Sequence, residues 1–460
     1  MSSAAQGVAR AGRPQSPPNR PYHFPVFERR RLDNGTQLII ASVRKLPLAT
    51  VCVVVDAGAV TDPAGREGIA SLTADLLLEG TAKLSGAEIV ERFEQLGAAL
   101  EIETDWDVTV ISLTALSDHL APAVRLLGEL LRAPAFPARE VDRLKSERRA
   151  ELIALRSEPR GLADVMFSRV LYAGASRYAR PAGGTEASIV AIAGDDVRKF
   201  YEQWYRAGAL TLVFVGDVDA DAAERMAREA FSTVPGGAPA PATTSSDAAR
   251  PGRAVHLVSK PDAQQAELRI GHTGLPRKHP DYFGATVMNA VLGGLFSSRI
   301  NLNLRERNGY TYGASSHFDW RRQAGPFVVS TAVQTEVMAK AAAEVITEID
   351  RIRAAEVDAD ELSLATSYLD GLFPIRFETT ESIAAALVNI TTFGLPDDYH
   401  DTYRSRVRAT SASDVHAAAK KHLHSGALQM LVVGDVSLLR GQIDALGFGP
   451  LSVYEPDDLP

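Results

Sequence analysis

Residues 207–218 read AGALTLVFVGDV, and residues 425–436 read SGALQMLVVGDV. Each stretch is preceded by an amphipathic segment that opens with Asp-Val, at Asp196 in the first half of the chain and at Asp414 in the second. A helix-then-strand pattern that recurs with the same short motif is not expected by chance. This internal repeat predicts two homologous domains.

The segment between the repeats is low in apolar surface. Residues 235–252 read PGGAPAPATTSSDAARPG, a Pro/Ala/Ser/Gly composition that is typical of a linker. We therefore expect a disordered N-terminal arm at 1–21, one domain at 22–234, a second at 253–450, and a C-terminal tail at 451–460.

Strands and helices mix within each half. In the first half, the β-branched, apolar runs 35–42 and 47–57 are expected to be neighbouring strands, followed by a helix over 68–79. Ser85 and Glu88 form a capping-box pattern for the next helix. The pattern continues with strands at 98–104 and 107–116 and helices at 117–132 and 139–156. The predicted fold class is α+β, with two α/β sandwich domains, each a mixed or antiparallel sheet with helices on one face.

Composition excludes several classes of protein. The 460 residues are 45% hydrophobic, with 49 Lys and Arg against 57 Asp and Glu, a net charge of −8. An acidic chain of this kind argues against binding to nucleic acid or to an anionic membrane. No apolar run approaches the roughly 20 residues that span a bilayer. Cys52 is the single cysteine, which excludes an internal disulfide.

The first residues give an expectation for location. Residues 1–20 are rich in Arg, Pro, Ser and Ala and contain no continuous apolar run of roughly 7–15 residues, as a secretory signal requires. A cytoplasmic location is therefore expected, or a periplasmic one if the true start codon lies elsewhere.

One stretch carries a family resemblance. GREGIASLTADLLLEGT, residues 65–81, resembles the signature helix of the insulinase/pitrilysin family of zinc peptidases, in the branch of the mitochondrial processing peptidase. Active members carry H-x-x-E-H there, two zinc-binding histidines and a catalytic glutamate. The flanking residues place Ser71, Ala74 and Asp75 at these three positions, and the family's third ligand, a glutamate on a later helix, falls on Glu151.

These replacements remove the family's chemistry. Catalytic zinc needs three protein ligands and an open position for water, but Asp75 and Glu151 offer only carboxylates, which suit magnesium or calcium better. Ala74 cannot accept a proton from a metal-bound water. The ten histidines are scattered in the sequence, and the pair His422 and His424, two positions apart, is expected to be polar surface. We expect no metal and no cofactor in this chain, with a metal held by the two carboxylates as the open alternative.

The second half retains the other family signature. LGGLFSSRINLNLRERNGYTYGASSHF, residues 292–318, resembles the family's C-terminal motif, in which an arginine and a tyrosine contact the peptide substrate. By this resemblance they are Arg305 and Tyr312. A phenol can donate a hydrogen bond to a developing oxyanion, and a guanidinium can donate to substrate carbonyls. The alternative is that Arg305 pairs with a nearby acid, and that Tyr310 is the exposed ring while Tyr312 lies in the core.

The resemblance implies a function. An altered zinc helix beside an intact second signature is similar to the non-catalytic subunit of a heterodimeric zinc metalloendopeptidase. Such a subunit would contribute chamber wall and peptide contacts in trans, and would be active only with an H-x-x-E-H partner that holds the zinc. Two alternatives remain open: a scaffold derived from a peptidase, and a peptide-binding, chaperone-like subunit without proteolytic role.

Overall fold

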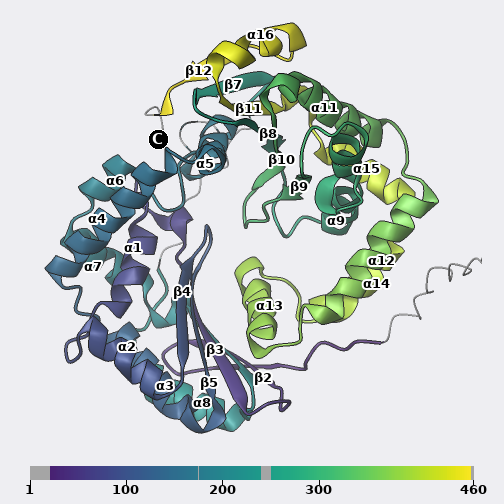
Figure 1. Cartoon of the computed structure of the whole chain (residues 1–460). Helices are drawn as coiled ribbons and strands as arrows, with labels where there is room; N and C mark the ends of the chain where they lie inside the picture. Colours follow the sequence, from purple (N-terminus) through teal and green to yellow (C-terminus); the bar gives the residue numbers. More distant parts are fainter. Residues whose placement is uncertain (1–20, 173, 175, 240–249, 457–460) are drawn as a thin grey trace, which may run out of the picture.

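The computed structural model describes residues 21–172, 174, 176–239 and 250–456. All but the last residue of the expected arm, most of the expected linker and the last four residues of the chain lie outside the described part. The described chain forms two domains, each with a six-stranded mixed sheet (Figure 1). The predicted fold class, two homologous α/β domains, is confirmed.

The first domain runs from the first described strand to the start of the linker. Its strands are β1 (Glu28–Arg31), β2 (Gln37–Ser42), β3 (Leu48–Val55), β4 (Ala99–Thr104), β5 (Thr109–Leu116) and β6 (Leu210–Gly216). Its α-helices are α1 (Ile69–Asp75), α2 (Gly86–Gln95), α3 (Ser117–Arg132), α4 (Ala138–Leu155), α5 (Pro159–Leu171), α6 (Glu186–Ala191), α7 (Gly194–Trp204) and α8 (Ala220–Phe231).

The second domain repeats this plan, again with six strands and eight α-helices among the described residues. Its strands are β7 (Ala254–Ser259), β8 (Gln265–Thr273), β9 (Ala314–Phe318), β10 (Pro326–Gln334), β11 (Gln429–Gly434) and β12 (Leu451–Tyr454). Its α-helices are α9 (Tyr282–Asn289), α10 (Arg299–Asn301), α11 (Met338–Ala354), α12 (Ala359–Ile375), α13 (Thr380–Phe393), α14 (Tyr399–Ala409), α15 (Ala412–His422) and α16 (Val436–Leu446). Two π-helical segments, η5 (Ala290–Gly294) and η6 (Leu302–Arg307), flank α10.

Local sequence determines several helix ends. The capping box predicted at α2 is present: the Ser85 hydroxyl accepts from the Glu88 N–H at 3.4 Å, and the Glu88 carboxylate accepts from the Ser85 N–H at 2.8 Å. The helix predicted over 68–79 forms as α1 and a short 3₁₀ continuation, and Gly80 follows with a φ of 148°, which favours glycine.

The repeated motif occupies the same place in both sheets. The strand orders are β1-β2-β6-β3-β5-β4 and β12-β7-β11-β8-β10-β9, so β6 and β11 lie third in each. Each pairs parallel to one neighbour and antiparallel to the other. The prediction that 35–42 and 47–57 are neighbouring strands is wrong, because β6 lies between β2 and β3. Every residue of β6 is buried, and a strand that is apolar on both faces belongs inside a sheet.

Two predicted boundaries differ from the structure. Residues 451–454, expected in the tail, form β12, which pairs parallel with β7 at the edge of the second sheet. At the other end of the chain, the predicted first domain, 22–234, includes Phe24. Its ring lies 4.4 Å from that of His400 and 5.2 Å from that of Phe377, both in the second domain. Each of these segments joins the domain that offers it an apolar partner.

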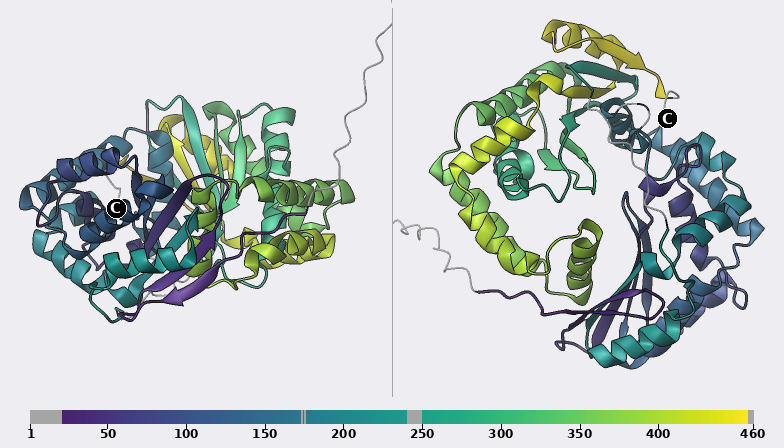
Figure 2. Two further views of the ribbon diagram at one scale, coloured as in Figure 1. Left: turned by 90° about the horizontal axis from the view of Figure 1, so that it is seen from below. Right: turned by 180° about the vertical axis from the view of Figure 1, so that it is seen from behind.

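One helix of each domain packs against the sheet of the other domain. In each domain one face of the sheet is covered by the domain's own helices, while α13 of the second domain packs on β3 and β6, and α5 of the first packs on β8 and β11 (Figures 1 and 2). Hydrogen bonds cross both contacts: Thr50 to Thr380 at 2.8 Å, and Arg269 to Asp164 at 2.7 Å. The apolar cluster that contains Val213 of β6 continues into the second domain, which fixes the domains against each other.

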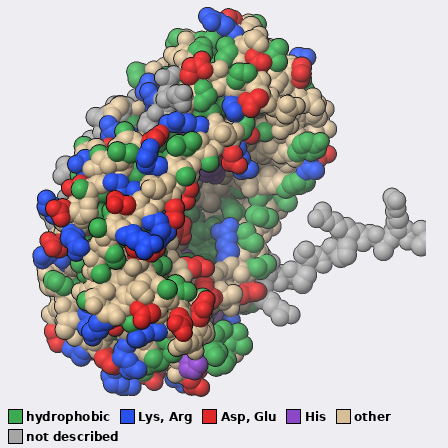
Figure 3. All heavy atoms as spheres, turned by 60° about the vertical axis from the view of Figure 1, so that its left-hand side comes forward, with side chains coloured by type: hydrophobic (Ala, Val, Ile, Leu, Met, Phe, Trp, Pro, Cys, Tyr) green, Lys and Arg blue, Asp and Glu red, His purple; other side chains and the backbone are tan. Residues whose placement is uncertain are grey.

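The surface agrees with the composition. Basic and acidic side chains are interspersed over the face shown in Figure 3, which is hollowed between the two halves of the molecule. Among the described helices, none combines the length and the apolar character needed to cross a membrane.

Candidate functional site

The helix that resembles the zinc helix starts at a buried anchor. The Asp62 carboxylate, which is fully buried, accepts from the N–H of Gly68 at 2.6 Å and of Ala70 at 3.0 Å. It also pairs with Arg177 at 2.7 Å. Gly68 adopts a φ of 94°, and a Cβ there would lie 2.7 Å from the carbonyl oxygen of Gly183. The start of α1 is therefore fixed by one carboxylate and one glycine.

Three of the four positions implied by the resemblance meet in one pocket. Ser71 and Asp75, one turn apart on α1, line a cavity of about 170 Å³ together with Glu151 of α4. Ala74 is buried in the interior of the first domain instead. The fold thus brings three of the four positions to one cavity, where they supply a hydroxyl and two carboxylates.

A guanidinium shares this pocket. Arg148 lines it and binds Glu151 at 2.8 Å and the carbonyl oxygen of Gly183 at 3.1 Å. Its Nη2 lies 1.3 Å from the place that a Cβ on Gly183 would take, so the arginine fills the space of a missing side chain. Zinc does not fit this donor set, because no imidazole lines the pocket and a fixed positive charge stands beside the carboxylates.

The pKa of Asp75 is raised to about 6. Burial is the largest cause, Glu151 and Glu79 raise it further, and the positive charge of Arg148 acts against them. Solvent reaches the carboxylate at the mouth of the pocket, but the surrounding protein atoms still disfavour its charged form.

This shift gives a prediction for stability against pH. Because the folded-state pKa of Asp75 lies above its unfolded value, the unfolded chain ionises first, and folding stability is lost as pH rises from about 4 to about 6. We expect Asp75→Asn to raise the Tm relative to the wild type at pH 8 but not at pH 4, with a small amplitude because solvent screens the charge. Thermal unfolding at both values tests it, and an equal change in Tm at the two would contradict it.

The second signature places its two residues differently. Tyr312 is 91% exposed, whereas Tyr310 is half-buried and packs against the core. Arg305 lies in the π-helical segment η6, with its guanidinium carbon 4.5 Å from the ring centre of Phe296, itself 71% exposed. The acid nearest to it is the adjacent Glu306, at 3.5 Å. Tyr312, and not Tyr310, is therefore the exposed ring. π-Helical segments are rare and occur frequently at functional sites.

The loop around these residues is ordered by Asn301. Its side-chain amide donates to the carbonyl oxygen of Phe296 at 2.6 Å, and its amide oxygen accepts from the N–H of Ala314 at 3.0 Å. Phe296 and Tyr312 line one cavity of about 520 Å³, which Asn301 also borders. One asparagine thus fixes the relative position of the two chain segments that carry the exposed rings.

The floor of this cavity is charged. Arg269 of β8, almost fully buried, pairs with Glu267 at 2.8 Å and with Asp164 of the first domain at 2.7 Å. The cavity therefore borders the contact between the domains, and offers apolar rings at its rim and charged groups at its base.

A second cavity, of about 450 Å³, lies between β4, β5 and α13. It is lined by the acids Glu101, Glu103, Asp105 and Glu381, and by Cys52. Burial raises the pKa of the Cys52 thiol to about 11, so this cysteine is a neutral packing residue at physiological pH.

One cluster was missed by sequence reasoning. His279, Asp281 and His422 place their ligand atoms within 4.8 Å of one another. The expectation that His422 and His424 are surface residues is wrong for His422, which is buried against His279. His424 is exposed, as expected, and its ring lies 4.8 Å from that of His272. The sequence gives only a weak indication of this cluster, because His422 lies more than a hundred residues after His279 and Asp281. Only the spacing of His279 and Asp281 is local.

Comparison with known proteins identifies the family. Residues 39–181 match the family model described as Insulinase (Peptidase family M16), and residues 191–369 match the one described as Peptidase M16 inactive domain. The chain is 25% identical over 398 residues to the protein named Non-peptidase homolog YmxG of Helicobacter pylori, covering 85% of this chain and 90% of that one. It is 26% identical over 279 residues to the probable mitochondrial-processing peptidase subunit beta of Schizosaccharomyces pombe, covering 59% of each.

A solved structure supports the same assignment. The crystal structure described as a peptidase M16 inactive domain from Pseudomonas fluorescens aligns with a TM-score of 0.84 and 27% identity, covering 89% of this chain and 98% of that one. The match extends over most of the chain, in which residues 65–81 contain no H-x-x-E-H motif. From the two model matches and the shared two-domain fold, this chain belongs to the insulinase family, peptidase family M16.

Proposed function

We propose that this chain is the non-catalytic subunit of a two-subunit zinc metalloendopeptidase, and that it completes the site of an H-x-x-E-H partner with Arg305 and Tyr312. One observation carries the proposal: residues 65–81 contain no H-x-x-E-H motif, whereas the arginine and tyrosine of the second signature are present as Arg305, which is half-buried, and Tyr312, which is exposed. Zinc and the general base belong, in this proposal, to the partner.

The exposure of Tyr312 supports a contact outside the chain. A tyrosine ring that is 91% exposed contributes little to its own fold. Tyr312 and Phe296 line the same cavity, and the guanidinium of Arg305 stacks on the ring of Phe296. These three side chains form a patch of two aromatic rings and one positive charge. Aromatic and arginine side chains in such an arrangement are the groups that dominate binding sites.

The two side chains supply complementary chemistry. The Tyr312 hydroxyl can donate a hydrogen bond to the oxygen of a scissile carbonyl as negative charge develops on it. The Arg305 guanidinium offers several N–H donors in a fixed planar arrangement and can donate to backbone carbonyls of a peptide. Neither group activates water, so the proposal requires a second subunit for the nucleophile.

The names of the relatives fit this division of roles. The protein of Schizosaccharomyces pombe is named as a subunit of a processing peptidase, and that of Helicobacter pylori as a non-peptidase homologue. Membership in a family that includes both kinds of protein supports a non-catalytic subunit here.

The test is reconstitution. The chain is co-expressed with an H-x-x-E-H homologue from the same genome, and cleavage of a library of quenched fluorescent peptides is measured. We expect no cleavage by this chain alone, and cleavage by the pair at least about 10-fold above that of the partner alone. A partner whose motif glutamate is changed to glutamine serves as the control and should inactivate the pair.

Other outcomes separate the alternatives. Peptide binding by the pair without cleavage would favour the chaperone-like subunit, and a complex without peptide binding would favour the scaffold. Chelator-sensitive cleavage by this chain alone would contradict the proposal directly.

A further inference from the structure

We propose that His279, Asp281 and His422 form a binding site for a divalent first-row transition-metal ion, of which Zn²⁺ matches the donors best. The site is separate from the pocket around Asp75 and from the Arg305 and Tyr312 patch, and it does not rest on the proposed function. Of the residues that the structure describes, these three form the one group of His, Cys, Asp or Glu with ligand atoms this close together.

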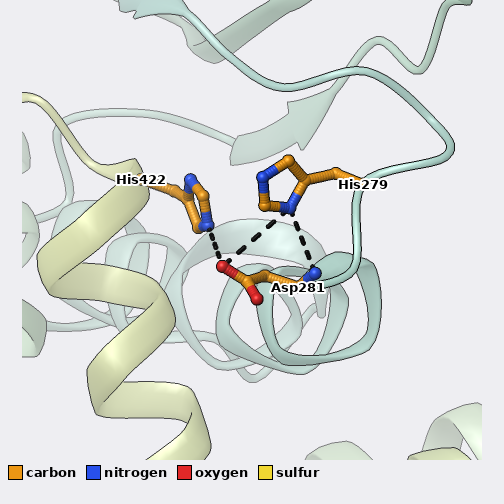
Figure 4. A group of neighbouring side chains, drawn as sticks. All are labelled: His279, Asp281 and His422. Atoms are coloured by element: carbon orange, nitrogen blue, oxygen red, sulfur yellow. Dashed lines mark hydrogen bonds and ion pairs between the residues drawn. The ribbon is translucent and has the colours of Figure 1, made fainter.

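The side chains converge on one point (Figure 4). The Nε2 atom of His422 lies 2.7 Å from Oδ2 of Asp281, and Nδ1 of His279 lies 3.9 Å from the same oxygen. Ligand atoms of a tetrahedral zinc ion, at about 2.0–2.2 Å from the metal, are about 3.3 Å apart. The observed distances lie on both sides of this value, so side-chain movements of about 1 Å would complete the geometry.

Rigid elements hold the three ligands. His279 and Asp281 flank Pro280 in the turn that opens α9, and His422 is the last residue of α15. The two helices pack closely, because a Cβ on Gly284 of α9 would lie 3.3 Å from the Cβ of Ala418. A site built on packed helix ends is pre-organised, which lowers the cost of binding.

The donor set favours zinc over harder cations. Two imidazoles and one carboxylate match the ligands of many zinc sites, whereas magnesium and calcium prefer oxygen. His422 is 8% exposed, while His279 and Asp281 are half-buried, so the ion would be reachable from solvent and would keep positions open for water.

Metal binding would replace existing hydrogen bonds. The short contact between His422 Nε2 and Asp281 Oδ2 holds a proton, which would move to Nδ1 of the same ring or leave to solvent as the metal takes its place. Nδ1 of His279 accepts from the N–H of Asp281 at 3.1 Å, and this bond would give way to the metal. In both cases the metal would replace the lost hydrogen bond, so each ligand atom would keep a partner.

One lysine competes for the carboxylate. Nζ of Lys421 lies 2.7 Å from Oδ2 of Asp281, where it occupies part of the space of the metal. Its side chain is 62% exposed, so it can turn into solvent when an ion binds. This competition makes a prediction that a purely structural cluster does not: removing the lysine charge should strengthen metal binding.

Titration of the tag-free, chelator-treated full chain with Zn²⁺ tests the proposal, with Co²⁺ absorption as a second readout. We expect one ion per chain, and an affinity lowered about 100-fold in His279→Ala and in His422→Gln. Lys421→Ala should raise the affinity about 5-fold by removing a like charge. His416→Ala, on the same helix, is the matched control and should bind as the wild type does.

Defined results would overturn the proposal. The first is a wild-type chain that binds no Zn²⁺ at 100 µM, a concentration about 10-fold above the Kd of a weak site. The second is Zn²⁺ binding that stays at the wild-type level in both histidine variants. Binding lost in Asp75→Ala with Glu151→Ala, but kept in His279→Ala, would place the ion in the first domain instead. Because Lys421→Ala leaves all three ligands in place, weaker binding by that variant would contradict the competition argument even if the histidine variants fold poorly.

Discussion

Replacing Arg305 with alanine and Tyr312 with phenylalanine together is expected to lower kcat/KM of the reconstituted pair about 100-fold or more. The double change removes the hydrogen-bond donor proposed for the oxyanion and the cationic donor proposed for the peptide backbone, while it keeps the tyrosine ring. Tyr312 is exposed, and the ion pair of Arg305 is with its sequence neighbour Glu306, so stability should hardly change.

The two single variants should affect different kinetic constants. Tyr312→Phe is expected to lower kcat, because its hydroxyl acts when charge develops, and Arg305→Ala is expected mainly to raise KM. Steady-state kinetics with a fixed, saturating amount of this chain over its partner measure both.

Two neighbouring residues provide matched controls. Tyr310→Phe removes the same hydroxyl from a half-buried ring, and Arg307→Ala removes the same charge from an exposed position two residues away. Both should leave kcat/KM within about 2-fold of the wild type. Equal losses in the controls, or an unchanged rate in the double variant, would show that Arg305 and Tyr312 do not complete the partner's site.

Asp62→Ala is expected to lower the free energy of unfolding by about 3–5 kcal/mol, which corresponds to a Tm lowered by about 10 °C. The substitution leaves the Arg177 guanidinium, whose side chain is 12% exposed, without its carboxylate, and it leaves the N–H groups of Gly68 and Ala70 without their acceptor. The start of α1, and with it the pocket around Asp75, should loosen.

The matched control is another Asp-Arg pair of similar length. Asp33 binds Arg228 at 2.6 Å, but its side chain is 90% exposed, so Asp33→Ala should cost less than about 1 kcal/mol. Circular dichroism during heating and in urea compares the two variants. A similar small loss in both would show that burial of Asp62 does not make its ion pair important for stability.

Local structure followed the sequence closely. The helix predicted over 117–132 has those bounds as α3, and the capping box of Ser85 and Glu88 opens α2. These features depend on residues within one or two turns of each other, so the sequence contains their whole cause. The absence of an H-x-x-E-H motif from residues 65–81 is also a local property, readable from the sequence alone.

Contacts between distant segments could not be read in the same way. The insertion of β6 between β2 and β3, and the exchange of α5 and α13 between the domains, depend on which apolar faces meet after the chain collapses. Sequence spacing reports which face of a strand is apolar but not which partner covers it. For this reason the prediction that the strands at 35–42 and 47–57 pair with each other is wrong.

The sequence by itself determined that the chain holds two copies of one α/β domain, and that residues 65–81 of the first copy contain no H-x-x-E-H motif. Only the tertiary structure decided that Tyr312 is exposed while Tyr310 is half-buried, that Arg148 lines the pocket beside Asp75, and that His279 meets His422. The physical reason is that residue type and periodicity are local properties. Exposure, shared cavities and ligand clusters depend on how segments far apart in the chain pack against one another.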